Sequence, residues 1–349
     1  MDPRSNPRGE RSGPPVQNPG QNPNDLRRLP WNHDLWIAPI TSLEPLVAGP
    51  SRRFLEHAGV PHVIRDLKNP DRLIAVFQWF PMDEKLRESF DRIALRISED
   101  NGKTWSEPKT IQVAGMDPQM QRPFDPTLLQ LPDGRYRLFF TSNLRPNLNQ
   151  RPPQNFGQGG QRPPEGLMNS GQRPGPMGHE VPRQIYSALS GDLSVFTFEE
   201  GPRTDRVFRE SIVDATVSAH GGKFFMMAHP GPRSSPFEVS QGYFAVSQDG
   251  KKFERLMNRV GPPGVDFIGN LVSSNGKLHY VGAGPSGIWS MSSTDGEEWG
   301  RGVLSKIKGG DPSVFFDRNN QGYIVYVGDP RSDSVAQPPW NRGIGGPQN

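Results

Sequence analysis

Short apolar runs recur along the chain, and turn residues separate them. Residues 72–79 (RLIAVFQW), 136–141 (YRLFFT) and 223–228 (KFFMMA) are rich in aliphatic and aromatic side chains. Runs of this length and composition, bounded by Gly, Pro, Asn or Asp, are typical of β-strands. No apolar stripe with a 3.6-residue period continues for the length of a helix. The pattern therefore predicts an essentially all-β protein.

The runs group into a repeating unit of two strands around a turn, followed by a third strand. In three of the units the first turn contains glycine, at Asp133-Gly134, Gly221-Gly222 and Asn275-Gly276. Such turns favour β-hairpins. A self-similar unit of roughly 45–60 residues with three or four strands is the pattern of β-propeller blades.

The two ends of the ordered pattern complete one further unit. The last unit has only two strands, at residues 312–316 and 323–327, and the first ordered residues hold two unassigned strands, at 34–38 and 53–56. Pairing the N-terminal strands with the C-terminal ones closes the ring and removes exposed sheet edges. We therefore predict a five-bladed β-propeller in which N-terminal strands close the last blade.

Three segments are too poor in apolar residues to build a core. They are dominated by Pro, Gly, Asn, Gln and Arg, and the 349-residue chain contains 39 glycines and 38 prolines. This composition predicts disorder. The predicted organisation is a disordered arm (1–29), a propeller (30–331) with a low-complexity insertion in its second blade (145–182), and a disordered tail (332–349).

Charge and cysteine content narrow the function classes. The 40 Lys and Arg residues nearly balance the 37 Asp and Glu residues, so a nucleic-acid partner is not indicated. The chain has no cysteine, which excludes disulfides, thiolate metal sites and a cysteine nucleophile. No apolar run reaches the roughly 18 residues of a membrane span. The N-terminal residues show no apolar signal-peptide core.

One short motif recurs after the third strand of successive units. Residues 98–105 (SEDNGKTW) contain the full set of Ser, Asp, Gly and an aromatic residue, and residues 247–253 and 293–299 are copies shorter by one residue. Residues 190–196 are a copy without the glycine. In such a turn the Asp side chain accepts local N–H bonds, glycine takes a positive φ, and the aromatic ring packs into the blade.

This motif resembles the Asp-box of bacterial neuraminidase repeats. The resemblance implies a sialidase-like propeller in which the Asp-box aspartates are structural and do not take part in catalysis. By analogy with relatives of this kind, it also implies a secreted or periplasmic protein.

Aligning the units places Asp125, Asp214 and Asp311 at the same position, where an innermost strand begins. Their surroundings (FDPT, VDAT and GDPS) resemble the inner-strand aspartates of five-bladed glycoside hydrolases of the arabinanase and xylosidase type. The resemblance implies that these carboxylates meet at one mouth of the channel and act as general acid and base across a glycosidic bond. The alternative is that each aspartate only starts a strand and bonds to local N–H groups.

The chain departs from that family pattern in its first and third units. Val60 stands where those hydrolases carry an aspartate base, and Asp214 stands where they carry a glutamic acid. The Arg-Ile-Pro start of sialidases is absent. These departures keep open a second hypothesis, a carbohydrate-binding propeller without catalysis.

Polar and aromatic residues near predicted strand ends complete the candidate site. Trp79 could stack on a sugar ring or pack in the core. The histidines could contact the ligand or have structural roles. The candidate arginines could bind a carboxylate. The candidate substrate-binding residues are His62, Arg65, Trp79, Arg122, Asn143, His229, Asn270 and Arg331.

No cofactor is expected, and no metal site is assigned. A metal ion held by Asp125, Asp214 and His62, or a calcium ion in the scaffold, is an alternative. The sequence thus predicts an exo-acting, sialidase-like glycoside hydrolase acting on a carbohydrate at the channel mouth. The alternatives are the non-catalytic carbohydrate-binding propeller and a protein-interaction scaffold that uses the Pro-rich segments.

Overall fold

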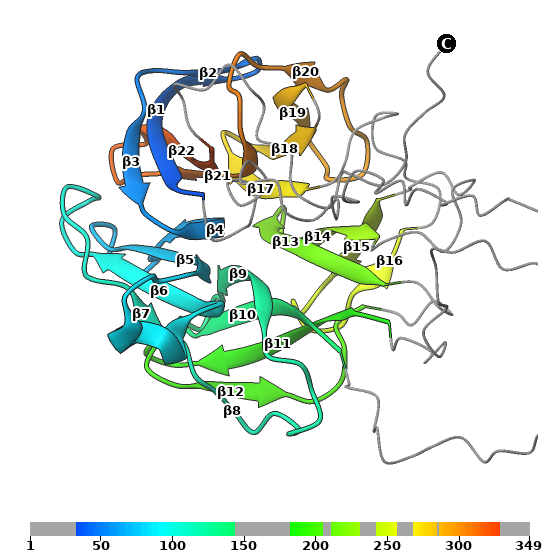
Figure 1. The fold of residues 1–349 in the computed structure, drawn as a ribbon. Helices are drawn as coiled ribbons and strands as arrows, with labels where there is room; N and C mark the ends of the chain where they lie inside the picture. The colour runs from blue at the N-terminus through cyan, green and yellow to red at the C-terminus, as the bar shows by residue number, and fades with distance from the viewer. Residues whose placement is uncertain are drawn as a thin grey trace, which may run out of the picture.

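Five small sheets stand in a ring in the computed structural model, which describes residues 33–143, 182–204, 211–230, 242–256, 268–284 and 286–328 (Figure 1). The prediction of a five-bladed β-propeller is therefore confirmed. Within these ranges one short 3₁₀ helix, η3 (Glu84–Ser89), lies between two strands. No helix in this part of the chain is long and apolar enough to cross a membrane. The segments 1–29, 145–181 and 332–349 lie outside the described residues.

Each of blades 1 to 4 runs from the channel outward in chain order. Blade 1 comprises β4 (Ala58–Arg65), β5 (Leu73–Trp79), β6 (Arg92–Ser98) and β7 (Lys109–Thr110). Blade 2 comprises β9 (Phe124–Gln130), β10 (Tyr136–Ser142), β11 (Gln184–Ser190) and β12 (Phe196–Glu199), with β8 (Val113–Ala114) parallel to β12. Blade 3 comprises β13 (Ile212–His220), β14 (Lys223–Pro230), β15 (Tyr243–Ser247) and β16 (Glu254–Arg255). Blade 4 comprises β17 (Ile268–Ser274), β18 (Lys277–Gly284), β19 (Gly287–Ser293) and β20 (Val303–Leu304).

Blade 5 joins the two ends of the ordered chain. Its inner strands are β21 (Gly310–Phe316) and β22 (Gly322–Val327), and β1 (Leu35–Leu43) pairs with β22 in antiparallel register. The predicted closure by N-terminal strands is thus confirmed. Two short strands share the outer edge of β1. They are β2 (Leu46–Ala48) and β3 (Arg52–Leu55), and each pairs with part of β1. The sequence pattern predicts only the second of these two outer strands.

The hydrophobic core is divided among the five interfaces between neighbouring blades. Strand β5 shows how this arises, because Leu73, Ala75 and Phe77 pack toward blade 5 whereas Ile74 and Val76 pack toward blade 2. Successive side chains of a strand point to opposite faces of its sheet. A strand between two neighbours must therefore be apolar on both faces, which explains the unbroken apolar runs in the sequence.

The Ser-x-Asp turns close the hairpins between third and fourth strands as expected from their composition. In the full copy, Asp100 accepts hydrogen bonds from the Thr104 backbone and hydroxyl groups, and Gly102 has φ +84°. In the degraded copy, Leu193 takes the left-handed conformation (φ +68°) in place of glycine. The hydrogen bonds lower the pKa of Asp100 to about 2, led by the bond from the Thr104 side chain. These aspartates are structural parts of their turns.

Candidate active site

Four of the five inner strands begin with the same irregularity. The pairing with the second strand shifts register at this point in β4, β9, β13 and β21. The residue at the shift has a left-handed backbone in each case: Val60 (φ +47°), Asp125 (φ +53°), Asp214 (φ +52°) and Asp311 (φ +42°). The structure therefore places the three aspartates and Val60 at equivalent positions. We call the end of the ring where these strands begin the amino end, and the other the carboxyl end.

The bulge itself favours aspartate over most residues. A left-handed backbone costs least for Gly, Asn and Asp, and it is strained for a β-branched residue such as Val60. Strand β17 of blade 4 pairs with β18 without a register shift, so the described residues of this strand hold no equivalent bulge. An aspartate at this position is thus consistent with a local structural role as well as with chemistry.

A ring of polar side chains lies just beyond the bulges and joins neighbouring inner strands. The Ser313 hydroxyl accepts the N–H of Val63 at 3.1 Å, and the Asn270 Oδ1 accepts the N–H of Val314 at 3.0 Å. Thr216 accepts the N–H of Leu271 in the same way. The remaining two contacts are Leu128 N–H to His62 Nδ1 (3.4 Å) and the Thr127 hydroxyl to the Ala215 carbonyl (2.6 Å).

Asp125 and Asp214 are hydrogen-bonded to each other through their side chains. Burial raises the pKa of both, to about 6 for Asp125 and well above the usual range for Asp214, where the neighbouring Asp125 charge adds to the effect. The bond stabilises ionised Asp125 and protonated Asp214, so the shared proton resides on Asp214. Thr141 supports the pair, because its hydroxyl bonds to the Asp125 carboxylate and accepts the Asp214 N–H at 3.2 Å.

Asp311 is the third carboxyl group of this end. Its side chain is 9% exposed, and burial followed by the charge of Asp214 raises its pKa to about 7. The N–H of Val60 donates to the carboxylate, while the buried Oδ1 atom has no hydrogen-bond partner among the described residues. The group is therefore poised to lose a proton near neutral pH.

Arg183 is the cation that acts on this cluster. Its charge lowers the pKa of both Asp125 and Asp214, against the effect of burial. The guanidinium carbon lies 5.5 Å from the ring centroid of Phe124, which directly precedes Asp125. Arg183 and Thr141 are functional candidates that the sequence did not reveal. Arg183 follows the low-complexity segment, and Thr141 stands in an ordinary apolar strand, so neither carries a motif.

Two predicted binding residues belong to the polar ring. His62 is 5% exposed, and burial lowers its pKa to about 4, so the imidazole is neutral at pH 7. Asn270 is 2% exposed and uses its Oδ1 on the next strand. Trp79 lies near the amino end but is 8% exposed and packs in the core between blades 5 and 1.

Of the three predicted arginines, the two that the structure describes contact groups other than the three aspartates. Arg65 is at the last position of β4, at the carboxyl end, where it donates to the Asp317 carbonyl at 2.7 Å. Arg122 forms an ion pair with Asp91, the residue directly before the third strand of blade 1. Arg331 lies outside the described residues. Strand direction, and not distance along the chain, decides which end of the ring Arg65 reaches, so its role in substrate binding stays a prediction.

The last two predicted residues lie where second strands end at the amino end: His229 in the last part of β14, and Asn143 directly after β10. Asn143 is 8% exposed and its carbonyl accepts the N–H of Gln121 at 2.7 Å. His229 pairs across the sheet with Val213, the neighbour of Asp214. His229 thus lies at the amino end, one position along the sheet from the bulge at Asp214.

The described side chains at this end of the ring do not form a metal-binding cluster. Within the described ranges, no group of three His, Asp or Glu side chains is arranged to hold a metal ion. The Nδ1 atom of His62, part of the predicted alternative, is occupied by the Leu128 N–H.

Comparison with known proteins gives likeness in structure only. Neither a protein-family model nor the sequence of a curated protein matches the chain. An endo-arabinase from Bacteroides thetaiotaomicron VPI-5482 is similar, with 16% identity, coverage of 79% of this chain and 90% of the other, and a TM-score of 0.50.

Two further solved structures illustrate the range of the likeness. A protein of unknown function from Dyadobacter fermentans DSM 18053 is 20% identical over 78% of this chain and 95% of the other, with a TM-score of 0.39. Zg3597, a family 117 glycoside hydrolase from Zobellia galactanivorans, is 14% identical over 74% of this chain and 72% of the other, with a TM-score of 0.46. At 16% identity the likeness to the endo-arabinase concerns the fold alone, which in this chain is the five-bladed propeller described above.

Proposed function

We propose that this chain is an exo-acting, sialidase-like glycoside hydrolase that acts on a glycan at the amino end of the ring. The observation that carries the proposal is the convergence of Asp125, Asp214 and Asp311, at equivalent bulges, with pKa values raised by burial. Raised carboxyl pKa values are the property that acid–base catalysis of glycoside cleavage requires. A secreted or periplasmic location is part of the same proposal.

The geometry suggests how the three groups divide the work. Two carboxyl groups that flank a glycosidic bond are about 5–9.5 Å apart. Asp125 and Asp214 are in hydrogen-bond contact, so they act in this proposal as one proton-holding unit on one side of the bond. Asp214 gives its proton to the leaving-group oxygen as the C–O bond breaks. Asp311 takes a proton from the water whose oxygen attacks the anomeric carbon.

A screen of aryl glycosides, including arabinosides, xylosides, galactosides and sialosides, tests this function. We expect turnover of at least one class by the wild type, and a loss of about 100-fold or more in kcat for Asp214→Asn, since general acid catalysis contributes on that scale. Asp133→Asn is the control, because Asp133 is an exposed aspartate in a hairpin turn. Turnover that survives in both Asp214→Asn and Asp311→Asn would contradict the assignment.

A second candidate function is carbohydrate binding without hydrolysis. It is favoured by Val60, which leaves the equivalent position of blade 1 without a carboxylate. In that case the wild type should bind glycans on an array without turnover, and Val60→Asp should gain turnover because it adds a base beside Asp311. Val60→Asn is the matched control, since it relieves the same backbone strain without adding a carboxylate. Equal activity of the two variants would argue against a missing base.

A further inference from the structure

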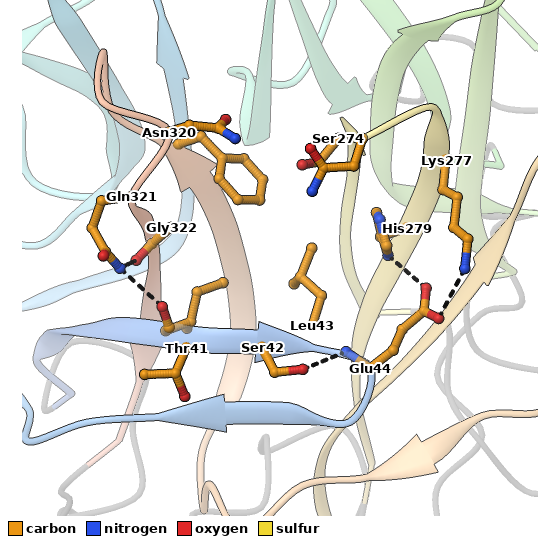
Figure 2. A pocket seen from close by; sticks show the side chains of 13 residues that line it. Thr41, Ser42, Leu43, Glu44, Ser274, Lys277, His279, Asn320, Gln321 and Gly322 are labelled. Atoms are coloured by element: carbon orange, nitrogen blue, oxygen red, sulfur yellow. Dashed lines mark hydrogen bonds and ion pairs between the residues drawn. The ribbon is translucent and has the colours of Figure 1, made fainter.

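A separate pocket lies at the carboxyl end, where blades 4 and 5 meet. It has a volume of about 640 Å³ and is bordered by the end of β1, the β17–β18 hairpin and the β21–β22 hairpin (Figure 2). Pockets for small molecules are typically about 300–1,000 Å³. Phe316 on its wall is five residues along β21 from Asp311, which corresponds to roughly 17 Å of strand. The pocket is therefore distinct from the aspartate site.

The charges of this pocket cancel. Glu44 accepts a hydrogen bond from the Lys277 ammonium at 3.2 Å, and the other residues that line the pocket, apart from His279, carry no ionisable group (Figure 2). Burial lowers the pKa of His279, so its imidazole is neutral at pH 7. Glu44 is ionised, because a hydrogen bond from Ser292 and the Lys277 interaction lower its pKa despite some burial. A charged ligand would have to displace this internal ion pair or remain uncompensated.

Hydrogen-bonding groups remain available on the same wall. The His279 Nδ1 atom lies 3.2 Å from Glu44 Oε1 but makes no hydrogen bond. The imidazole ring is hydrogen-bonded to the Ser274 backbone. The imidazole thus lies against the Glu44 carboxylate on this wall (Figure 2). Ser274 is 8% exposed, and its hydroxyl has no partner among the described residues. Ser274 lines the pocket, so a ligand there could supply the missing partner of this hydroxyl.

Apolar groups complete the lining. Ile40, Leu43 and Phe316 contribute aliphatic and aromatic surface beside the polar wall. Neutral sugars have this dual character, because hydroxyl groups that donate and accept hydrogen bonds surround an apolar C–H face. A ligand hydroxyl can donate to Glu44 and accept from Lys277 or Ser274.

We propose that this pocket is a second binding site for a neutral, hydroxyl-rich ligand of monosaccharide size. The site is independent of the aspartate cluster and goes beyond the function proposed for it.

Titration of the full chain with arabinose, xylose and galactose, followed by calorimetry and ligand-observed NMR, tests this site. Galacturonate serves as the charged counterpart of galactose. We expect millimolar binding of at least one neutral sugar, weaker binding of galacturonate, and an affinity loss of about five- to tenfold in Lys277→Gln and in Ser274→Ala. Lys223→Gln is the matched control, because Lys223 follows the equivalent hairpin turn of blade 3 and pairs with Glu297 at 3.7 Å. This control should bind as the wild type does.

Three results would overturn the proposal. They are no binding of any neutral sugar, unchanged affinity in both Lys277→Gln and Ser274→Ala, and tighter binding of galacturonate than of galactose. Asp214→Asn separates this site from the proposed hydrolase function, since it should leave the binding intact. Binding that is lost in Asp214→Asn but kept in Lys277→Gln would assign the sugar to the amino end and would also overturn the second site.

Discussion

The aspartates of the inner strands combine a backbone requirement with an electrostatic effect. Asp311 shows both, because its φ of +42° is a conformation that Asp tolerates better than most residues, and burial raises its pKa to about 7. Asp100, in the turn of blade 1, shows the opposite effect, since hydrogen bonds led by Thr104 lower its pKa to about 2. The same residue type thus serves as a proton holder in one place and as a fixed anion in the other.

This difference predicts opposite effects of pH on stability. The pKa of Asp311 is raised above the unfolded value of about 3.9, so the folded state loses stability as pH rises from about 4 to 7. Asp311→Asn removes this loss. Its free energy of unfolding relative to wild type should therefore increase between pH 4 and pH 8, by at most about 4 kcal/mol.

Urea denaturation at pH 4, 6 and 8 measures the effect, with Asp100→Asn as the control of opposite sign. Asp100 contributes stability above the unfolded pKa and loses it as pH falls toward 2. Asp100→Asn should thus be destabilised at neutral pH, and its difference from wild type should shrink below pH 4. A difference for Asp311→Asn that stays constant from pH 4 to 8 would show that this carboxyl group is not perturbed.

At the scale of elements, the hairpin turns fix each blade through glycines with positive φ. Gly296 in the blade 4 turn has φ +76°, and a β-carbon there would collide with the ring of Phe225 in blade 3. Gly276, in the β17–β18 turn, has φ +73°, but a β-carbon there would meet no atom within 4 Å. The first glycine is therefore required for conformation and for packing, and the second for conformation alone.

Substitution by alanine separates these two contributions. We expect Gly276→Ala to cost about 1 kcal/mol, which is the scale of a left-handed backbone for alanine. Gly296→Ala should cost roughly 1–3 kcal/mol more, because the added methyl group overpacks against Phe225. Thermal and urea unfolding of both variants provide the comparison. Equal costs for the two substitutions would mean that the turn does not pack against blade 3 as described.

At the scale of the whole molecule, ring closure brings distant segments to one site. The pairing of β1 with β22 closes the last blade, and the inner strands β4, β9, β13, β17 and β21 then surround the axis (Figure 1). Asp125 and Asp214 come into contact only because blades 2 and 3 are neighbours in this ring. The site thus draws on several blades, and no single blade contains it.

The sequence predicts the local features well and the contacts between blades poorly. Strands, hairpins and the register of Asp125, Asp214 and Asp311 follow from alternation and turn chemistry, which act over a few residues. The hydrogen bond between Asp125 and Asp214, the role of Arg183 and the position of Arg65 at the opposite end depend on how blades face one another. Side-chain contacts of this kind are decided by packing and strand direction, which sequence spacing does not record.

The central claim is that burial raises the pKa values of the inner-strand aspartates well above those of ordinary aspartates, and titration of the aspartate carboxyl carbons by ¹³C NMR tests it most directly. Assignment uses Asp125→Asn, Asp214→Asn and Asp311→Asn. We expect Asp125 to titrate near pH 6, Asp311 near pH 7, and Asp214 above both, with the pKa of Asp125 changing when Asp214 is replaced. Titration of all three groups below about pH 4.5, as in ordinary exposed aspartates, would contradict the account.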